Sequence, residues 1–87
     1  MERVFVDTSA WFAYANRADR EHEAIKGVLA SFQGRLVTSN FVYDETITYC
    51  ANRLGHLTAT LIGDHLLTAQ SIDLVRVLPD DELVAWN

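Results

Sequence analysis

The residues of this sequence with the clearest capacity for chemistry are an aspartate and two hydroxyl residues near its start. Asp7 directly follows the apolar run 4–6, and Thr8 and Ser9 come next. An uninterrupted apolar run is typical of a strand in a parallel sheet, where ligands bind beyond the carboxyl ends of the strands. A carboxylate and two hydroxyls at that edge could bind a divalent cation or a phosphoryl group. The alternative is an aspartate that only ends the strand and caps the next helix.

A second acidic pair, Asp44 and Glu45, lies about one turn into a helix that we predict over residues 40–54. This helix follows the apolar run 36–38, whose carboxyl end should lie beside that of the first run, so the helix should begin near Asp7. The apolar stripe of the helix favours a different interpretation of Glu45. Because Glu45 lies nearly opposite that stripe, it would be an ordinary solvated glutamate. The stripe is Tyr43, Ile47, Cys50, Ala51 and Leu54.

The rest of the pattern predicts strands that alternate with helices. Thr8 and Ser9 are N-cap candidates for a first helix, and Asp19 is expected to open a second, whose apolar face is Ile25, Val28, Leu29 and Phe32. Strands are predicted at 4–6, 36–38 and 73–77, and helices at 10–15, 19–32, 40–54 and 57–70, with a last helix starting at Pro79. Strands separated by helices favour an α/β fold of three layers, in which a short parallel sheet is flanked by helices.

The composition limits the classes of function. With 87 residues, of which 49% are apolar and 22% charged, the chain is expected to be a single globular domain. Its net charge of −5 disfavours nucleic-acid binding through a basic surface, but it allows a nuclease in which a metal ion supplies the positive charge. Cys50 is the only cysteine, which excludes an internal disulfide and favours the cytoplasm. Neither a membrane span nor a signal peptide is predicted.

Two segments of the sequence resemble a known family. VFVDTSAWFA at 4–13 and TSNFVYDETITY at 38–49 are similar to the PIN domain, and most of all to the VapC-like toxins of bacterial and archaeal toxin–antitoxin pairs. The helix with an early histidine at 21–24, the Arg-Leu-Gly turn at 53–55 and the strand at 74–77 fit the same order. The resemblance therefore extends over the whole chain.

This resemblance implies a metal-dependent endoribonuclease, whose carboxylates surround Mg²⁺ or Mn²⁺ at the carboxyl edge of a parallel sheet. Asp7 matches the first of the family's acids and Glu45 the second, which makes both of them expected catalytic residues and metal ligands. Ser9 matches the hydroxyl residue beside the first acid, and Thr8 belongs with it as a residue that orients substrate or ligands. The resemblance also implies an RNA substrate and a cognate antitoxin partner.

The family's remaining acids lie beyond the helix expected at Pro79, and this chain ends before them. We therefore expect residues 1–87 to be a single, C-terminally truncated PIN-like domain, either a natural short form or a part of a longer gene product. Asp80, Asp81 and Glu82 fall at an earlier family position and do not replace the later acids. Besides a ribonuclease, the alternatives are a PIN-derived binding module without catalysis and an unrelated phosphoryl-transfer domain with Asp7 as nucleophile.

Self-association is a further expectation. A short sheet exposes edge groups and apolar surface, which invite pairing, and the resemblance points to a homodimer. Aromatic residues that could anchor such an interface are Trp11, Phe12, Tyr14 and Trp86. The alternative is that these side chains only fill the core of the monomer.

Overall fold

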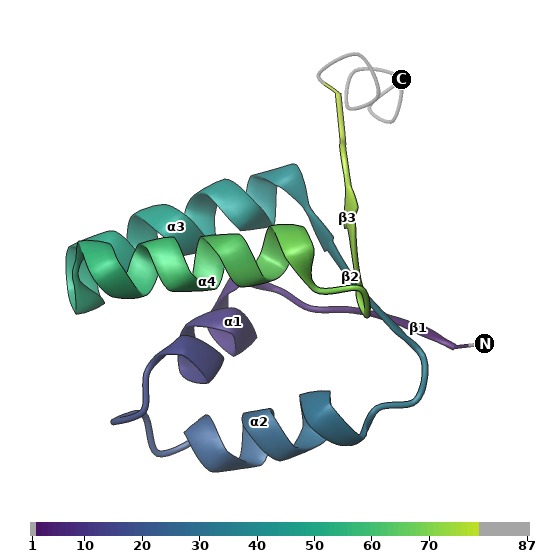
Figure 1. The fold of residues 1–87 in the computed structure, drawn as a ribbon, viewed down its shortest axis with the longest axis horizontal. Helices are drawn as coiled ribbons and strands as arrows, with labels where there is room; N and C mark the ends of the chain where they lie inside the picture. Colours follow the sequence, from purple (N-terminus) through teal and green to yellow (C-terminus); the bar gives the residue numbers. More distant parts are fainter. Residues whose placement is uncertain (1, 79–87) are drawn as a thin grey trace, which may run out of the picture.

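The computed structural model describes residues 2–78, which form a three-stranded sheet and four helices (Figure 1). The elements in chain order are β1 (Arg3–Phe5), α1 (Thr8–Ala15), α2 (His22–Ser31), β2 (Arg35–Ser39), α3 (Asn40–Leu54), α4 (His56–Thr68) and β3 (Ile72–Val75). The strands lie in the order β1-β2-β3, and both pairs are parallel. The predicted α/β fold with a short parallel sheet and flanking helices is confirmed.

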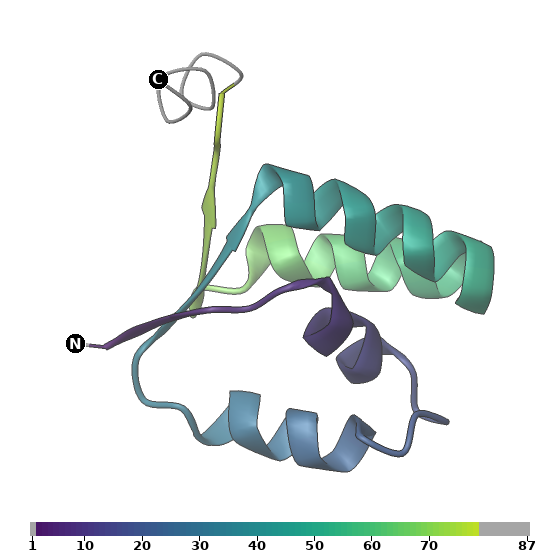
Figure 2. The ribbon, with the colours of Figure 1, turned by 180° about the vertical axis from the view of Figure 1, so that it is seen from behind.

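The helices carry the chain between the parallel strands. α1 and α2 connect β1 to β2, and α3 and α4 connect β2 to β3. Figures 1 and 2 show α3 and α4 side by side, with α1 packed beneath them and α2 on the far side of α1. Gly63 allows α4 to approach α3 closely, because a Cβ at this position would lie 2.8 Å from the Ile47 Cδ1 atom.

One hydrophobic core joins the helices to the sheet. Its buried members are Val6, Trp11, Leu36, Cys50, Ala59, Ile62, Leu66 and Ile72. The Trp11 indole Nε1 donates a hydrogen bond to the Thr38 hydroxyl at 3.3 Å, and that hydroxyl donates to the Val6 carbonyl at 3.4 Å. These contacts tie α1 to the ends of β1 and β2. Trp11 is only 1% exposed, so its predicted use as an interface anchor is wrong, because the side chain fills the core.

The boundaries of α3 follow from its end residues, as predicted. The Ser39 hydroxyl accepts a hydrogen bond from the Val42 backbone N–H at 3.1 Å, which caps the first turn. Gly55 ends the helix with a φ of 99°, a left-handed conformation that residues with a Cβ rarely adopt. α4 begins at the next residue, His56.

The start of α1 differs from the prediction. Asp7, and not Thr8 or Ser9, is the N-cap residue, since its backbone is still extended and both hydroxyl residues are already helical. The Asp7 side chain makes no capping hydrogen bond, and its Oδ1 atom accepts instead from the Ser9 hydroxyl at 2.9 Å. The carboxylate is therefore turned toward a side chain and away from the backbone N–H groups of the helix.

The start and the apolar face of α2 also need correction. Asp19 does not open the helix, because its Oδ1 atom accepts from the Glu21 backbone N–H at 2.8 Å in a local turn, and α2 starts at His22. Val28, which was expected on the buried face, is 62% exposed. The reason is that α2 packs mainly against one neighbour, the short helix α1.

The strands are displaced by one or two residues from the predicted ranges. β1 begins and ends one residue early, and β3 ends at Val75 although the pattern extends to Val77. The backbone N–H of Val77 donates to the Asn40 side-chain oxygen at 2.7 Å, so a side chain of α3 replaces β2 as its partner. The predicted helix from Pro79, and with it Trp86, lies outside the described residues.

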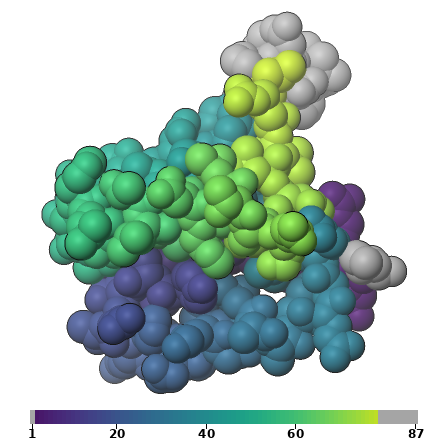
Figure 3. All heavy atoms as spheres, in the orientation of Figure 1, coloured from purple at the N-terminus to yellow at the C-terminus, as the bar shows by residue number. Residues whose placement is uncertain are grey.

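The surface combines ion pairs with exposed apolar side chains. Arg35 binds Asp73 on the neighbouring strand through two hydrogen bonds of 2.5 and 3.1 Å, which lower the pKa of the Asp73 carboxyl. Figure 3 shows α4 along one side of the molecule, and its exposed leucines are Leu57, Leu61 and Leu67. None of the helices within residues 2–78 has the length and apolarity needed to cross a bilayer.

Candidate active site

Two adjacent strand ends position the acidic residues that the sequence singled out. Asp7 lies between the end of β1 and the start of α1. Glu45 lies in the second turn of α3, which begins directly after β2. Because β1 and β2 are parallel neighbours, both helices start at the same edge of the sheet, and α1 packs against α3. The first turn of α1 therefore lies beside the second turn of α3.

A hydrogen bond joins the two segments at this meeting point. The Thr8 hydroxyl donates to the Glu45 Oε1 atom, across 37 positions of the sequence. The Ser9 hydroxyl donates to Asp7 Oδ1 at 2.9 Å, so each carboxylate has a hydroxyl partner. The structure thus brings Thr8, the residue next to Asp7, into contact with Glu45.

The charge of the pair is not compensated by basic side chains of the described residues. The salt bridges found within residues 2–78 all involve Asp73, which binds Arg3 and Arg35. Asp7 and Glu45 are both exposed. Two solvent-accessible carboxylates without a cationic partner are attractive to a cation from solution.

The donor atoms of the pair fit a hydrated divalent cation. Carboxylate and hydroxyl oxygens suit hard ions, and Mg²⁺ in particular keeps several of its waters when it binds a protein. Within residues 2–78, no group of three or more His, Cys, Asp or Glu side chains could hold a metal ion. An ion at Asp7 and Glu45 would therefore need water or additional ligands to complete its coordination.

Comparison with known proteins decides the family. Residues 4–87 match the PIN domain. The chain belongs to the PIN domain family. Its relatives include the 23S rRNA-specific endonuclease VapC20 from two strains of Mycobacterium tuberculosis, at 36% identity over 97% of this chain. The crystal structure of Mycobacterium tuberculosis VapC20, described as a sarcin-ricin loop cleaving toxin, matches with a TM-score of 0.84 and 34% identity over 95% of this chain.

These matches confirm the resemblance to the VapC-like members of the PIN family. The chain spans 63% of the length of the VapC20 relatives and 63% of the VapC20 chain in the crystal structure. The matched region contains both Asp7 and Glu45. Their roles as ligands and catalytic residues of this PIN domain stay predictions.

Two further titratable residues of the PIN domain, His22 and Cys50, are buried. His22 is buried, and its Nδ1 atom lies 2.9 Å from the Ala13 carbonyl oxygen. Burial raises the pKa of the Cys50 thiol, and this side chain is 0% exposed in the core. Both side chains therefore belong to the packing of the fold. Asp44 is exposed on α3.

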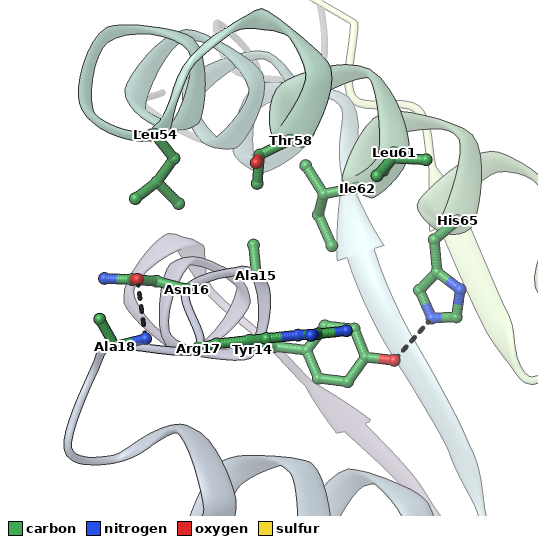
Figure 4. Close-up of a pocket in the computed structure, with 10 residues that line it drawn as sticks. All are labelled: Tyr14, Ala15, Asn16, Arg17, Ala18, Leu54, Thr58, Leu61, Ile62 and His65. Atoms are coloured by element: carbon green, nitrogen blue, oxygen red, sulfur yellow. Dashed lines mark hydrogen bonds between the residues drawn. The ribbon is translucent and has the colours of Figure 1, made fainter.

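A cavity of the molecule lies apart from Asp7 and Glu45. It has a volume of about 650 Å³ and lies between the end of α1 and the side of α4 (Figure 4). The Tyr14 ring stacks on His65 with 5.5 Å between ring centroids, and Arg17 lies beside it. The described residues that line this cavity carry no carboxylate, whereas a hydrolytic metal ion needs such ligands.

Two residues of α3 that the sequence did not single out follow Glu45 along the helix. Tyr49 follows Glu45 by four residues, and Arg53 follows by eight, so all three lie along one side of the helix. Phe12 of α1 contacts the Tyr49 ring, and the Arg53 guanidinium lies over it. A sequence signal for Tyr49 existed. Tyr49 follows Glu45 by four residues, as Phe12 follows Thr8, so each pair lies on one side of its helix.

Proposed function

We propose that this PIN domain is a metal-dependent endoribonuclease of the VapC toxin type, which hydrolyses RNA phosphodiester bonds. The observation that carries the proposal is the hydrogen bond between Thr8 and Glu45. This bond brings Glu45 to Thr8, the residue that follows Asp7. Asp7 follows β1, and the helix of Glu45 follows the neighbouring strand β2. The 23S rRNA endonuclease activity named for VapC20 supports the choice of RNA as the substrate.

Each residue of the pair has a defined task in this proposal. Asp7 and Glu45 would hold Mg²⁺ or Mn²⁺ through carboxylate oxygens. When bound, such an ion supplies an activated water and neutralises the charge that develops on the phosphodiester. Ser9 fixes the orientation of the Asp7 carboxylate through Oδ1, and Thr8 does the same for Glu45. One oxygen of each carboxylate remains for a ligand.

Removal of divalent metal tests the proposed activity. The purified protein is incubated with a labelled RNA that contains unpaired segments, in Mg²⁺ or Mn²⁺ and in parallel with excess EDTA. We expect discrete cleavage products with metal and none with EDTA, because the two carboxylates alone cannot activate water. Equal cleavage in both conditions would contradict a metal-dependent mechanism.

A PIN-derived binding module without catalysis is the second candidate function. The observation that favours it is the small size of the acidic set, since residues 2–78 contain no group of three potential ligands. Calorimetric titration with Mn²⁺ separates the two candidates when it is combined with the cleavage assay. RNA or protein binding without cleavage, at metal concentrations that saturate the protein, would favour the binding module.

We further propose that residues 1–87 act as one PIN-type unit in the cytoplasm, together with a cognate antitoxin protein. A single core that joins β2 and β3 to α1, α3 and α4 supports one unit. The antitoxin follows from the membership of the VapC-like group, and the cytoplasm follows from the RNA substrate and the single reduced Cys50.

A homodimer is the proposed assembly. Exposed apolar side chains are present on α4 and on the sheet, where Phe5 is 56% and Val75 is 42% exposed. Association would remove this surface from water, and a two-fold symmetric dimer is the commonest arrangement. Sedimentation equilibrium at micromolar concentration should show a species of twice the monomer mass. A single species of monomer mass would refute the dimer.

A further inference from the structure

The side of α3 that carries Glu45 continues into a stripe of aromatic and basic side chains. We define this stripe as Phe12, Tyr49 and Arg53. Tyr49 lies one turn beyond Glu45, and Arg53 lies two turns beyond it, about 12 Å along the helix axis. Phe12 faces Tyr49 from α1, in the same way as Thr8 faces Glu45 one turn earlier. The stripe is therefore a continuation of the acidic pair along the contact between α1 and α3.

The side chains of the stripe are ordered by contacts with one another. The rings of Phe12 and Tyr49 meet edge to face, with 4.7 Å between centroids and an interplanar angle of 90°. The Arg53 guanidinium carbon lies 4.6 Å from the centroid of the Tyr49 ring. Tyr49 is 37% exposed and Arg53 is exposed, so a ligand can reach both of them. These contacts hold a ring and a guanidinium together at the surface.

The charge of Arg53 is available to an anion. Within residues 2–78 the ion pairs involve Arg3 and Arg35, both with Asp73, and none includes Arg53. A protein of net charge −5 repels RNA at long range, so a basic side chain beside the acids would have a large local effect. Arg53 provides such a charge two turns from Glu45.

We propose that Phe12, Tyr49 and Arg53 form a nucleotide subsite that takes an unpaired RNA base and its adjacent phosphate next to the bond to be cleaved. Aromatic rings and guanidinium planes are the surfaces on which unpaired RNA bases stack, and guanidinium groups bind phosphate through charged hydrogen bonds. The inference rests on the proposed ribonuclease function, and it adds the residues that position the substrate.

A protein partner is the less suitable occupant of this surface. Protein interfaces share the preference for Tyr, Phe and Arg, so the choice of occupant rests on what surrounds these residues. The exposed aliphatic side chains of the described helices include Leu57, Leu61 and Leu67, and these lie on α4. The stripe instead has two rings in edge-to-face contact and a guanidinium that pairs with no acid of residues 2–78, and it follows Glu45 along α3, where an RNA substrate of the proposed site would pass.

RNA affinity can be measured separately from cleavage in an Asp7→Asn background. The probe is a fluorescein-labelled single-stranded RNA oligonucleotide, followed by fluorescence anisotropy in Mg²⁺ over a series of salt concentrations. Tyr49→Leu should weaken binding by about 5-fold to 150-fold, the usual range for loss of one base–aromatic stack. Tyr49→Phe should restore most of that loss, because the ring is kept. Circular dichroism confirms that each variant is folded.

The proposed contact of Arg53 with a phosphate is tested by the salt dependence of RNA binding, with a matched control. Arg53→Gln should reduce the slope of log affinity against log salt concentration by about 0.7, the value for one phosphate contact to a single strand. Lys26→Gln removes the same charge from the exposed side of α2 and should leave the slope unchanged.

The outcomes separate this inference from the proposed function. Loss of affinity in Tyr49→Leu together with the smaller salt slope of Arg53→Gln supports the subsite. If the unaltered protein cleaves RNA while both variants bind like the Asp7→Asn parent, the subsite is overturned and the ribonuclease stands. A change of oligomeric state in Tyr49→Leu with unchanged RNA affinity also overturns it, in favour of a protein interface. If the unaltered protein neither cleaves nor binds RNA, the proposed function itself fails.

Discussion

Asp7→Asn is expected to reduce the rate of RNA cleavage by more than about 100-fold, since even the outer partners of metal ligands typically contribute 10–100-fold. The amide has nearly the same shape as the carboxylate, but it lacks the charge and one of the two anionic oxygens that a hard cation needs. The hydrogen bond from the Ser9 hydroxyl can persist on the amide oxygen. The fold should therefore be preserved while the activity is lost. Single-turnover cleavage in Mg²⁺ and thermal unfolding measure the two properties.

Asp64→Asn is the matched control for this prediction. It removes one negative charge from an exposed position on α4, away from the meeting point of α1 and α3. We expect its cleavage rate to equal that of the unaltered protein, which would show that the loss in Asp7→Asn is not a general effect of net charge. Full activity in Asp7→Asn would refute the assignment of Asp7 as a metal ligand.

Trp11→Ala is expected to lower the free energy of unfolding by about 3–5 kcal/mol, the usual cost of removing a large buried aromatic side chain. The Trp11 ring lies in the core, and its indole N–H is hydrogen-bonded to Thr38. The change leaves a cavity and removes the link between α1 and β2. Because native proteins have a total stability of about 5–15 kcal/mol, this loss is a large fraction of it, and the midpoint of urea denaturation should fall strongly. Urea denaturation followed by circular dichroism measures the loss.

Leu61→Ala serves as the reference for this loss of stability. Leu61 is 61% exposed on α4, and its truncation should change the free energy of unfolding by no more than about 0.5 kcal/mol. Trp11→Phe keeps much of the ring volume but removes the hydrogen bond to Thr38, and we expect an intermediate loss. A Trp11→Ala variant as stable as Leu61→Ala would contradict the role of Trp11 as the central core residue.

Local signals in the sequence predicted much of the fold. The extent of α3 was predictable because Ser39 and Gly55 act on their own neighbours, through a capping hydrogen bond and a left-handed turn. The end of β3 was not, because Asn40 binds the backbone of Val77 from 37 residues away. A contact of that kind depends on tertiary structure, and the local pattern contains no trace of it.

The candidate site was likewise predictable in part. The position of Asp7 at a strand end could be predicted from the apolar run before it. The periodicity of α3 correctly indicated that Glu45 is exposed, but it could not show that Thr8 would lie within hydrogen-bonding reach. The expected start of this helix near Asp7 made Asp44 and Glu45 candidates, and the resemblance to a family then selected Glu45. The spacing of four residues places Tyr49 and Arg53 on the side of Glu45. The contact of Tyr49 with Phe12 depends on how α1 packs on α3, so it could be found only in the structure.

Because Cys50 is buried, the rate at which its thiol is alkylated can report local opening of the core. A thiol reacts as its thiolate, and the folded chain restricts this reaction both by excluding reagent and by raising the thiol pKa. Alkylation therefore requires a local opening of the core that α3 shares with α4. As this is the only cysteine in the sequence, the labelling rate reports the local opening free energy at one defined place. The labelling rate of Cys50 therefore measures how often α3, the helix that carries Glu45, opens locally.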